Sequence, residues 1–296
     1  MTFRPPLHIT SLSNPKIKDI VRLRQRSHRD DADALLIEGY RELKRALDNN
    51  YTPKQIVTCA ELFMGSHEQL LIDRCMERGA MHITCTVPVF KKISARDRPD
   101  GLIATGPQIR TSLSELSLPP NALVVVTEGI EKPGNLGTIL RSADSAGADA
   151  VIVCDHKTDI QNPNVVRASI GTLFALPVVE ADTEEAISFL VKNKFLILAS
   201  TPHAERLHVD CDLAGNTAIV VGAEQYGLSG AWLNSPDIVT ARIPMLGQSD
   251  SLNVASAATI LLYEAVRQRV AKDRTIVPPP HEHEQGGDDP HDRDCE

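Results

Sequence analysis

The sequence predicts an α/β protein with two domains, a smaller N-terminal domain and a larger one built on a mainly parallel sheet. Two observations support this fold class. Short apolar runs alternate with helix-period segments in both halves of the chain, and a polar, proline-containing stretch separates the halves. We expect an N-terminal domain at 8–108, a linker at 109–120, a second domain at 121–272 and a tail at 273–296.

Composition places the chain among soluble globular proteins, with 42% hydrophobic and 24% charged residues. No apolar run reaches the length of a membrane span, and the first residues lack the apolar centre of a signal peptide. We therefore expect a cytoplasmic protein with no membrane partner. The six cysteines are scattered without a C-x-x-C pair, which predicts buried thiols in place of a disulfide or metal framework.

The net charge of −8 is concentrated in the tail, which holds eight acidic residues and two arginines. The body of the protein is therefore nearly neutral, and a nucleic-acid partner is not excluded. Three consecutive prolines, two glycines and the acids predict a disordered tail. Its His281, His283 and His291 are an alternative site for a divalent metal, but without a fixed scaffold we expect a solvated tail.

The first element after the N-terminus is a basic helix. Asn14 followed by Pro15 is a helix-start signal. The helix is expected to hold Lys16, Lys18, Arg22, Arg24, Arg26 and Arg29 against one acid, Asp19. Two interpretations stay open: a solvated face above packed isoleucines, or an arm that contacts phosphates. In the second interpretation Arg22, Arg24 and Arg26 bind RNA.

The remainder of the first domain alternates strands and helices. Apolar runs predict strands at 35–37, 55–59, 81–87 and 103–104, and helix-period patterns follow the first strand and occupy 67–78. These elements make a small α/β domain with no catalytic cluster of its own.

The second domain has five apolar runs, at 123–126, 150–153, 195–198, 218–221 and 238–243. Helical patterns separate them, so we expect parallel strands with helices on both faces. A last helix, roughly 253–270, is so apolar in its first half that it must be buried in the core or against a partner subunit.

Three polar, glycine-containing clusters follow strands of this domain. The first holds Asn135, Gly137 and Arg141, the second Glu224 within 222–229, and the third Ser251 and Asn253, either of which can cap the last helix. Each cluster alone is more often an ordinary turn. Because parallel strands end at one edge of a sheet, we expect the three to converge where α/β sheets place their ligands.

Taken together, the clusters resemble the three motifs of the SpoU family of RNA ribose 2′-O-methyltransferases. The matching segments are GNLGTILR, GAEQYGLS and IPMLGQSDSLNVASAATILLYEAV, in that order, over about 150 residues of the second domain. LLIEGYRELKRAL and GLIATG in the first domain are similar to the family's RNA-binding domain. Gln225, Tyr226 and Ala255 depart from the residues common in relatives, and none is at a position expected to do chemistry.

The resemblance implies a C-terminal trefoil-knotted methyltransferase domain that binds S-adenosylmethionine and forms a homodimer, with the site near the dimer interface. The residues at matching or neighbouring positions, expected to bind the methyl donor, are Ser200, Thr201, Gly222, Ile243, Met245 and Leu252. A pocket of apolar side chains and backbone carbonyls suits a donor whose positive charge disappears during transfer, and no metal is needed.

The resemblance also implies the catalytic residues, which are Asn135, Arg141, Glu224, Ser251 and Asn253. In the family the arginine activates the ribose hydroxyl as a base. A guanidinium stays protonated in proteins, so binding the adjacent phosphate and stabilising a developing alkoxide is the alternative role. Asn135 would orient Arg141 or the ribose, and Glu224 would accept hydrogen bonds that fix this network.

The expected substrate is 23S ribosomal RNA, with transfer RNA as the alternative. A non-catalytic RNA-binding or assembly protein is a further alternative, which the intact motif residues disfavour. A dinucleotide-binding dehydrogenase is disfavoured because G-x-G-x-x-G is missing, although Asp155 stands where its acid is expected. The nucleotide that is modified, and any link to antibiotic resistance, cannot be read from the sequence.

Overall fold

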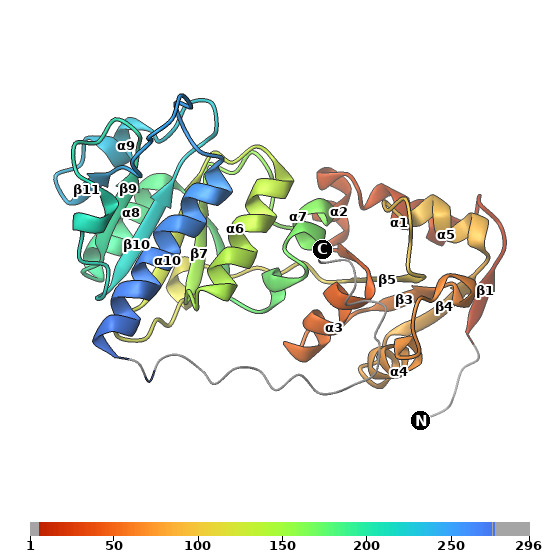
Figure 1. Cartoon of the computed structure of the whole chain (residues 1–296). Helices are drawn as coiled ribbons and strands as arrows, with labels where there is room; N and C mark the ends of the chain where they lie inside the picture. The colour runs from red at the N-terminus through yellow and green to blue at the C-terminus, as the bar shows by residue number, and fades with distance from the viewer. Residues whose placement is uncertain (1–5, 274, 276–296) are drawn as a thin grey trace. The chain divides into compact units, whose positions relative to one another are not determined.

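The computed structural model describes residues 6–273 and 275, which form two compact units (Figure 1). The first unit contains residues up to 109 together with 161–175, and the second contains 110–160 and the described residues from 176 onward. The predicted division placed 161–175 in the second domain. The predictions made for the acidic tail and its three histidines lie outside the described residues. Within the described part, no helix is both long and apolar enough to cross a membrane.

The first unit is built on a five-stranded sheet in which β1, β4 and β3 are parallel and β5 is antiparallel to both of its neighbours. The strand order across the sheet is β1 (Leu7–Ile9), β4 (Met81–Cys85), β3 (Gln55–Thr58), β5 (Leu102–Gly106) and β2 (Leu35–Glu38). Its helices are α1 (Pro15–Arg22), α2 (Arg26–Ala32), α3 (Tyr40–Asp48), α4 (Glu68–Glu77), α5 (Val87–Ile93) and α7 (Pro163–Ala168). Two apolar clusters cover the two faces of this sheet.

The basic segment forms two helices, not the single one expected from the sequence. The start is confirmed, because Asn14 accepts a hydrogen bond from Lys16 N and Pro15 opens α1. The helix stops at Arg22, and α2 begins at Arg26. The break leaves the carbonyl of the buried Leu23 without a helical partner, and the buried Arg29 donates to it from Nη1 at 2.8 Å. A buried carbonyl needs such a partner, and the sequence pattern did not reveal that Arg29 supplies it.

The second unit is built on a six-stranded, fully parallel sheet, which confirms the expected architecture. The order across it is β11 (Ile238–Ala241), β9 (Leu196–Ser200), β10 (Thr217–Val221), β6 (Leu123–Glu128), β7 (Ala150–Cys154) and β8 (Val178–Ala181). The helices are α6 (Pro133–Ser145), α8 (Thr183–Lys192), α9 (Gly230–Leu233) and α10 (Val254–Lys272). Val124 and Val126 pack with residues of α8 and α9, while α10 packs on α6 and β10. Alternate residues of a strand point to opposite faces, so helices cover both sides of the sheet.

Two strands were not predicted from the sequence. β1 has three residues, of which only Ile9 is buried, and β8 has two buried valines followed by polar Glu180. Both lie at the edge of their sheet. Each has only one or two buried apolar residues, so its apolar pattern is too short to stand out.

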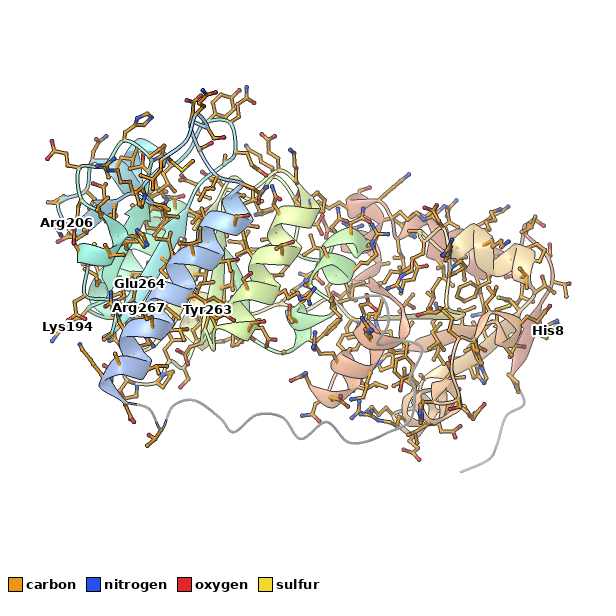
Figure 2. All side chains as sticks on the ribbon, viewed as in Figure 1. His8, Lys194, Arg206, Tyr263, Glu264 and Arg267 are labelled. Atoms are coloured by element: carbon orange, nitrogen blue, oxygen red, sulfur yellow. The ribbon has the colours of Figure 1, made fainter. Side chains whose placement is uncertain are left out.

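The last helix, α10, buries one face against α6 and β10. Leu261, Leu262 and the alanines beside them are buried, as the sequence predicted, whereas Ile260 and Tyr263 remain 39% and 48% exposed. Figure 2 labels Tyr263 and Arg267 along this helix. The trefoil knot stays a prediction.

Candidate active site at the carboxyl ends of the second sheet

The three polar clusters converge at one edge of the second sheet, as predicted. The loops that follow β9, β10 and β11 line a cavity of about 390 Å³, which continues to the first turn of α10. This volume is typical of small-molecule sites, which span roughly 300–1,000 Å³. All six residues predicted to bind the methyl donor lie on its wall: Ser200, Thr201, Gly222, Ile243, Met245 and Leu252.

The loop after β10 forms a tight turn that shapes one wall of the cavity. Ala223 N donates to Gly227 O at 3.1 Å and Gly227 N donates to Ala223 O at 2.9 Å. A Cβ at Gly222 would lie 2.3 Å from the carbonyl carbon of Gly227 and 2.5 Å from Leu228 N. Only glycine fits there, so the turn can close against the end of β10.

A chain of side-chain hydrogen bonds joins the three clusters. Asn135, in the first turn of α6, donates from Nδ2 to Glu224 Oε1 and accepts at Oδ1 from Asn253 Nδ2 at 3.2 Å. Asn253 in turn caps α10, because its Oδ1 accepts from Ala255 N at 3.0 Å and from Ser256 N at 3.4 Å. The orientation of each amide is therefore set by its partner. Glu224 was expected to accept hydrogen bonds, and it accepts one from Asn135. Asn253, not Ser251, makes the cap.

Arg141 lies further along α6 and is exposed. Its side chain makes no hydrogen bond or ion pair with residues 6–273 or 275, so the structure does not join it to Asn135. Its neighbour Ser142 is fixed to α10, with 2.7 Å between Ser142 Oγ and Thr259 Oγ1. The guanidinium can therefore bind an anionic ligand. The helix that holds it, α6, is anchored to α10. Ser251 lines the cavity and is exposed.

Glu128 was not among the residues predicted from the sequence. It holds the loop at 222–229 against the sheet. It ends β6 and is buried, yet its carboxylate accepts from Ser229 N and Oγ at 2.7 Å each, from Trp232 Nε1 at 3.1 Å and from Thr183 Oγ1 at 3.1 Å. These bonds tie the end of the 222–229 loop to the sheet. An acid at the end of an otherwise apolar strand was the available signal, because a buried carboxylate requires several donors.

The three arginines predicted to bind RNA lie in the first unit and differ in their surroundings. Arg24 donates from Nη2 to the carbonyls of Lys92, Ile93 and Ser94, at 3.1, 3.1 and 2.6 Å, and so caps α5. Arg22 forms an exposed ion pair with Asp19 at 3.4 Å, and Arg26 Nε lies 3.5 Å from an oxygen of Asp30. Binding of RNA by these residues stays a prediction.

Five cysteines fall within the described residues, and all are buried and free, as predicted. Burial raises the pKa of the thiols of Cys75, Cys85 and Cys154 to about 12, so they are poor nucleophiles at neutral pH. The described part of the chain contains no group of three or more His, Cys, Asp or Glu residues that could bind a metal ion.

Comparison with known proteins identifies the family. The model of the SpoU rRNA methylase family matches residues 122–263, and that of the MRM3-like substrate binding domain matches residues 14–104. A 23S rRNA (uridine(2479)-2′-O)-methyltransferase of Streptomyces viridochromogenes is 32% identical over 265 residues, which cover 87% of this chain and 90% of that protein. The chain belongs to the SpoU rRNA methylase family.

Solved structures of this family have the same arrangement of elements. An RNA 2′-O ribose methyltransferase is 41% identical and matches 89% of this chain and all of its own, with a TM-score of 0.78. An rRNA methyltransferase from Sinorhizobium meliloti with S-adenosylmethionine bound is 31% identical, with a TM-score of 0.80, over 88% of this chain and 97% of its own. The chain is therefore an RNA methyltransferase whose methyl donor is S-adenosylmethionine.

The lining of the cavity fits this donor. Ile243, Met245 and Leu252 provide apolar surface, and the turn at Gly222 presents backbone groups. Glu224 and Asp250 are acidic, whereas the described residues that line the cavity include no lysine or arginine. A lining with two acids and no fixed cation favours a sulfonium ligand, because the opposite charges attract.

Proposed function

We propose that this protein transfers a methyl group from S-adenosylmethionine to a ribose 2′-hydroxyl of 23S ribosomal RNA. The observation that supports it most strongly is the convergence of the Asn135, Glu224 and Asn253 network with the donor-sized cavity at one sheet edge. The Streptomyces viridochromogenes relative is named for this reaction on a uridine of 23S rRNA. S-adenosylmethionine, when bound in the cavity, supplies the methyl group from its sulfonium.

The residues of the chain have to position the hydroxyl in line with that methyl group and help it to lose its proton. We assign Arg141 the second task. Because it is exposed and has no partner in the described part of the chain, its guanidinium can bind the phosphate beside the target ribose and stabilise the oxygen as negative charge develops. With the donor bound, the hydroxyl proton would leave to water as the ribose oxygen takes the methyl group, and the donor's sulfonium would become a neutral thioether.

Asn135, Asn253 and Ser251 position the ribose in this proposal. The hydrogen bonds to Glu224 and to the N-cap of α10 fix the two amides before substrate arrives, so no free energy is spent on ordering them during the reaction. Glu224 acts by holding Asn135. No metal takes part, since the electrostatic work falls to Arg141.

We also propose that the second unit forms a homodimer, as the family resemblance implies. Exposed Ile260 and Tyr263 on α10 would be covered by the second copy. The measurement is molar mass by light scattering, for the wild-type protein and for Tyr263→Arg. A dimer that Tyr263→Arg dissociates supports the proposal, and a wild-type monomer at all concentrations contradicts it.

The activity is tested with labelled S-adenosylmethionine and three unmodified RNAs: 23S, 16S and transfer RNA. We expect label in 23S RNA, a loss of about 100- to 1,000-fold for Arg141→Ala, and a smaller loss for Asn135→Ala. Label in transfer RNA alone would replace the substrate assignment. A folded wild-type protein that binds the donor but labels none of these RNAs, nor precursor ribosomal particles, would contradict the function and favour a non-catalytic RNA-binding role.

A further inference from the structure

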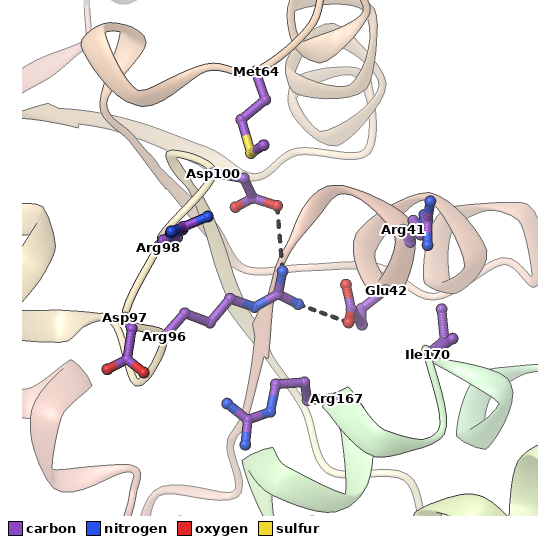
Figure 3. A pocket seen from close by; sticks show the side chains of 9 residues that line it. All are labelled: Arg41, Glu42, Met64, Arg96, Asp97, Arg98, Asp100, Arg167 and Ile170. Carbon is purple, nitrogen blue, oxygen red and sulfur yellow. Dashed lines mark hydrogen bonds and ion pairs between the residues drawn. The ribbon is translucent and has the colours of Figure 1, made fainter. Parts of the chain in front are cut away.

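The first unit contains a cavity of its own, of about 470 Å³, lined by four arginines (Figure 3). The lining comes from the start of α3, from Met64 before α4, from the loop that precedes β5 and from α7 with the residues after it. These segments are far apart in the sequence. We call this cavity the arginine pocket and define it by Arg41, Arg96, Arg98 and Arg167.

Arg96 crosses the pocket and neutralises its buried acids, as the dashed lines in Figure 3 show. Its Nη2 lies 2.7 Å from Glu42 Oε1 and donates to the Glu38 carbonyl at 2.8 Å, while Nη1 is 3.7 Å from Asp100 Oδ2. Asp100 also accepts from Tyr40 N at 2.8 Å. Burial raises the pKa of Glu42, which favours its neutral form. The floor therefore has little uncompensated negative charge.

The backbone around the pocket is shaped to hold this arrangement. Gly39 has φ +115°, and a Cβ there would lie 2.3 Å from both Arg96 Nη2 and Glu42 Oε2. Gly171 has φ +74°, and its Cβ would approach Glu42 Cα to 3.0 Å. Arg45 Nη1 donates to the Ile170 carbonyl at 2.7 Å. The segment after α7 is thus fixed on α3, and the position of α7 at the pocket is built into the fold.

The rim, which is the exposed part of the lining, has by contrast an excess of positive charge. Arg98 and Arg167 are exposed, and neither guanidinium forms a hydrogen bond or ion pair within the described part of the chain. Asp97 is the one exposed carboxylate among the described lining residues. The rim thus presents two exposed guanidinium groups, those of Arg98 and Arg167, against one carboxylate. Unpaired surface arginines are usually only solvated, but here they gather around one cavity whose other acids are already neutralised.

The chemistry of this rim selects the ligand. A guanidinium donates two parallel hydrogen bonds to a phosphate and remains charged at any physiological pH. The wall offers no aromatic side chain among its described residues, so stacking of a base has no platform. We propose that the arginine pocket binds a backbone phosphate of the RNA substrate, through Arg98 and Arg167. The proposal rests on the proposed function, because it assumes that the ligand is an RNA.

The test measures binding of an unmodified 23S RNA transcript at a series of salt concentrations. Arg98→Gln and Arg167→Gln should each weaken binding about fivefold. The double variant should lower the slope of log affinity against log salt by about 0.7, the contribution of one neutralised phosphate of a single strand. Asp97→Asn should tighten binding about threefold, since it removes a repelling charge. Affinity for S-adenosylmethionine should not change in any of these variants.

The matched control is Lys54→Gln, which also removes one exposed positive charge from the first unit. Lys54 precedes β3, at the opposite end of the sheet from Gly39 and Leu102. It should change binding by less than twofold, and thermal unfolding should confirm that every variant is folded.

The proposal is overturned if Arg98→Gln and Arg167→Gln behave like the control, if Asp97→Asn weakens binding, or if the wild-type protein does not bind the transcript. Binding needs no turnover, so the two hypotheses fail separately. Wild-type protein that binds RNA through these arginines but transfers no methyl group would contradict the proposed function alone. Normal transfer with unaltered binding in the variants would contradict only the arginine pocket.

Discussion

Replacing Gly222 by alanine should disrupt the wall of the donor cavity. The new Cβ would lie 2.3, 2.4 and 2.5 Å from the carbonyl carbon and oxygen of Gly227 and from Leu228 N, where ordinary contact begins at 3.4 Å. The turn must therefore move by about 1 Å, since backbone atoms cannot rotate away. That shift breaks the two hydrogen bonds between Ala223 and Gly227, which are 3.1 and 2.9 Å long. At about 1 kcal/mol each, the closed turn loses about 2 kcal/mol.

This loss corresponds to about a 30-fold weaker affinity for S-adenosylmethionine, because each 1.4 kcal/mol is a factor of ten. Titration calorimetry measures it directly. The matched control is Gly247→Ala, in the loop after β11, where an added Cβ meets nothing within 4 Å. We expect the control to bind within twofold of wild type. If Gly222→Ala bound S-adenosylmethionine as tightly as the control does, the turn would not shape the donor site.

Three further predictions concern charged groups. Asn135→Asp places a carboxylate against Glu224 and should reduce kcat/KM for methyl transfer about 100-fold. Adding Glu224→Gln restores a hydrogen-bond donor and should recover at least tenfold of that loss. A double variant no more active than Asn135→Asp alone would refute the role of this hydrogen bond. Glu128→Gln turns an amide toward the donors of Ser229 and should lower the free energy of urea unfolding by about 2 kcal/mol; no change would mean that these bonds do not stabilise the fold. The hydrogen bonds from Arg267 hold the pKa of Glu264 at about 2, below the unfolded value of about 4.3, so its stabilisation exists at pH 7 and fades as pH falls from about 5 to about 2. Glu264→Gln should therefore reduce stability at pH 7 but not near pH 2, and an equal loss at both values would contradict this.

The second domain was the more predictable part of the fold. Its long apolar runs are central strands, and turn residues after them had to meet at one edge because the strands are parallel. The residues around the cavity followed from motif positions in these loops. No sequence pattern could predict which side chains hydrogen-bond to one another within the site, such as the two hydrogen bonds that orient Asn135.

The features that were not predicted from the sequence have physical causes of the same kind. The edge strands β1 and β8 bury too little surface to give a periodic signal. The break between α1 and α2 depends on the buried Arg29, whose partner is a carbonyl six residues earlier. Arg167 belongs to the arginine pocket because residues 161–175 group with the first unit, a long-range placement that local sequence does not encode.

The most direct test of the proposed reaction locates the methyl group on the RNA. Unmodified 23S RNA is labelled by the protein from S-adenosylmethionine and then digested with alkali, which cleaves only beside a free 2′-hydroxyl. We expect the label to remain in a single alkali-resistant dinucleotide and to be lost with Arg141→Ala. Label released in mononucleotides would place the methyl group on a base and would contradict ribose 2′-O-methylation by this site.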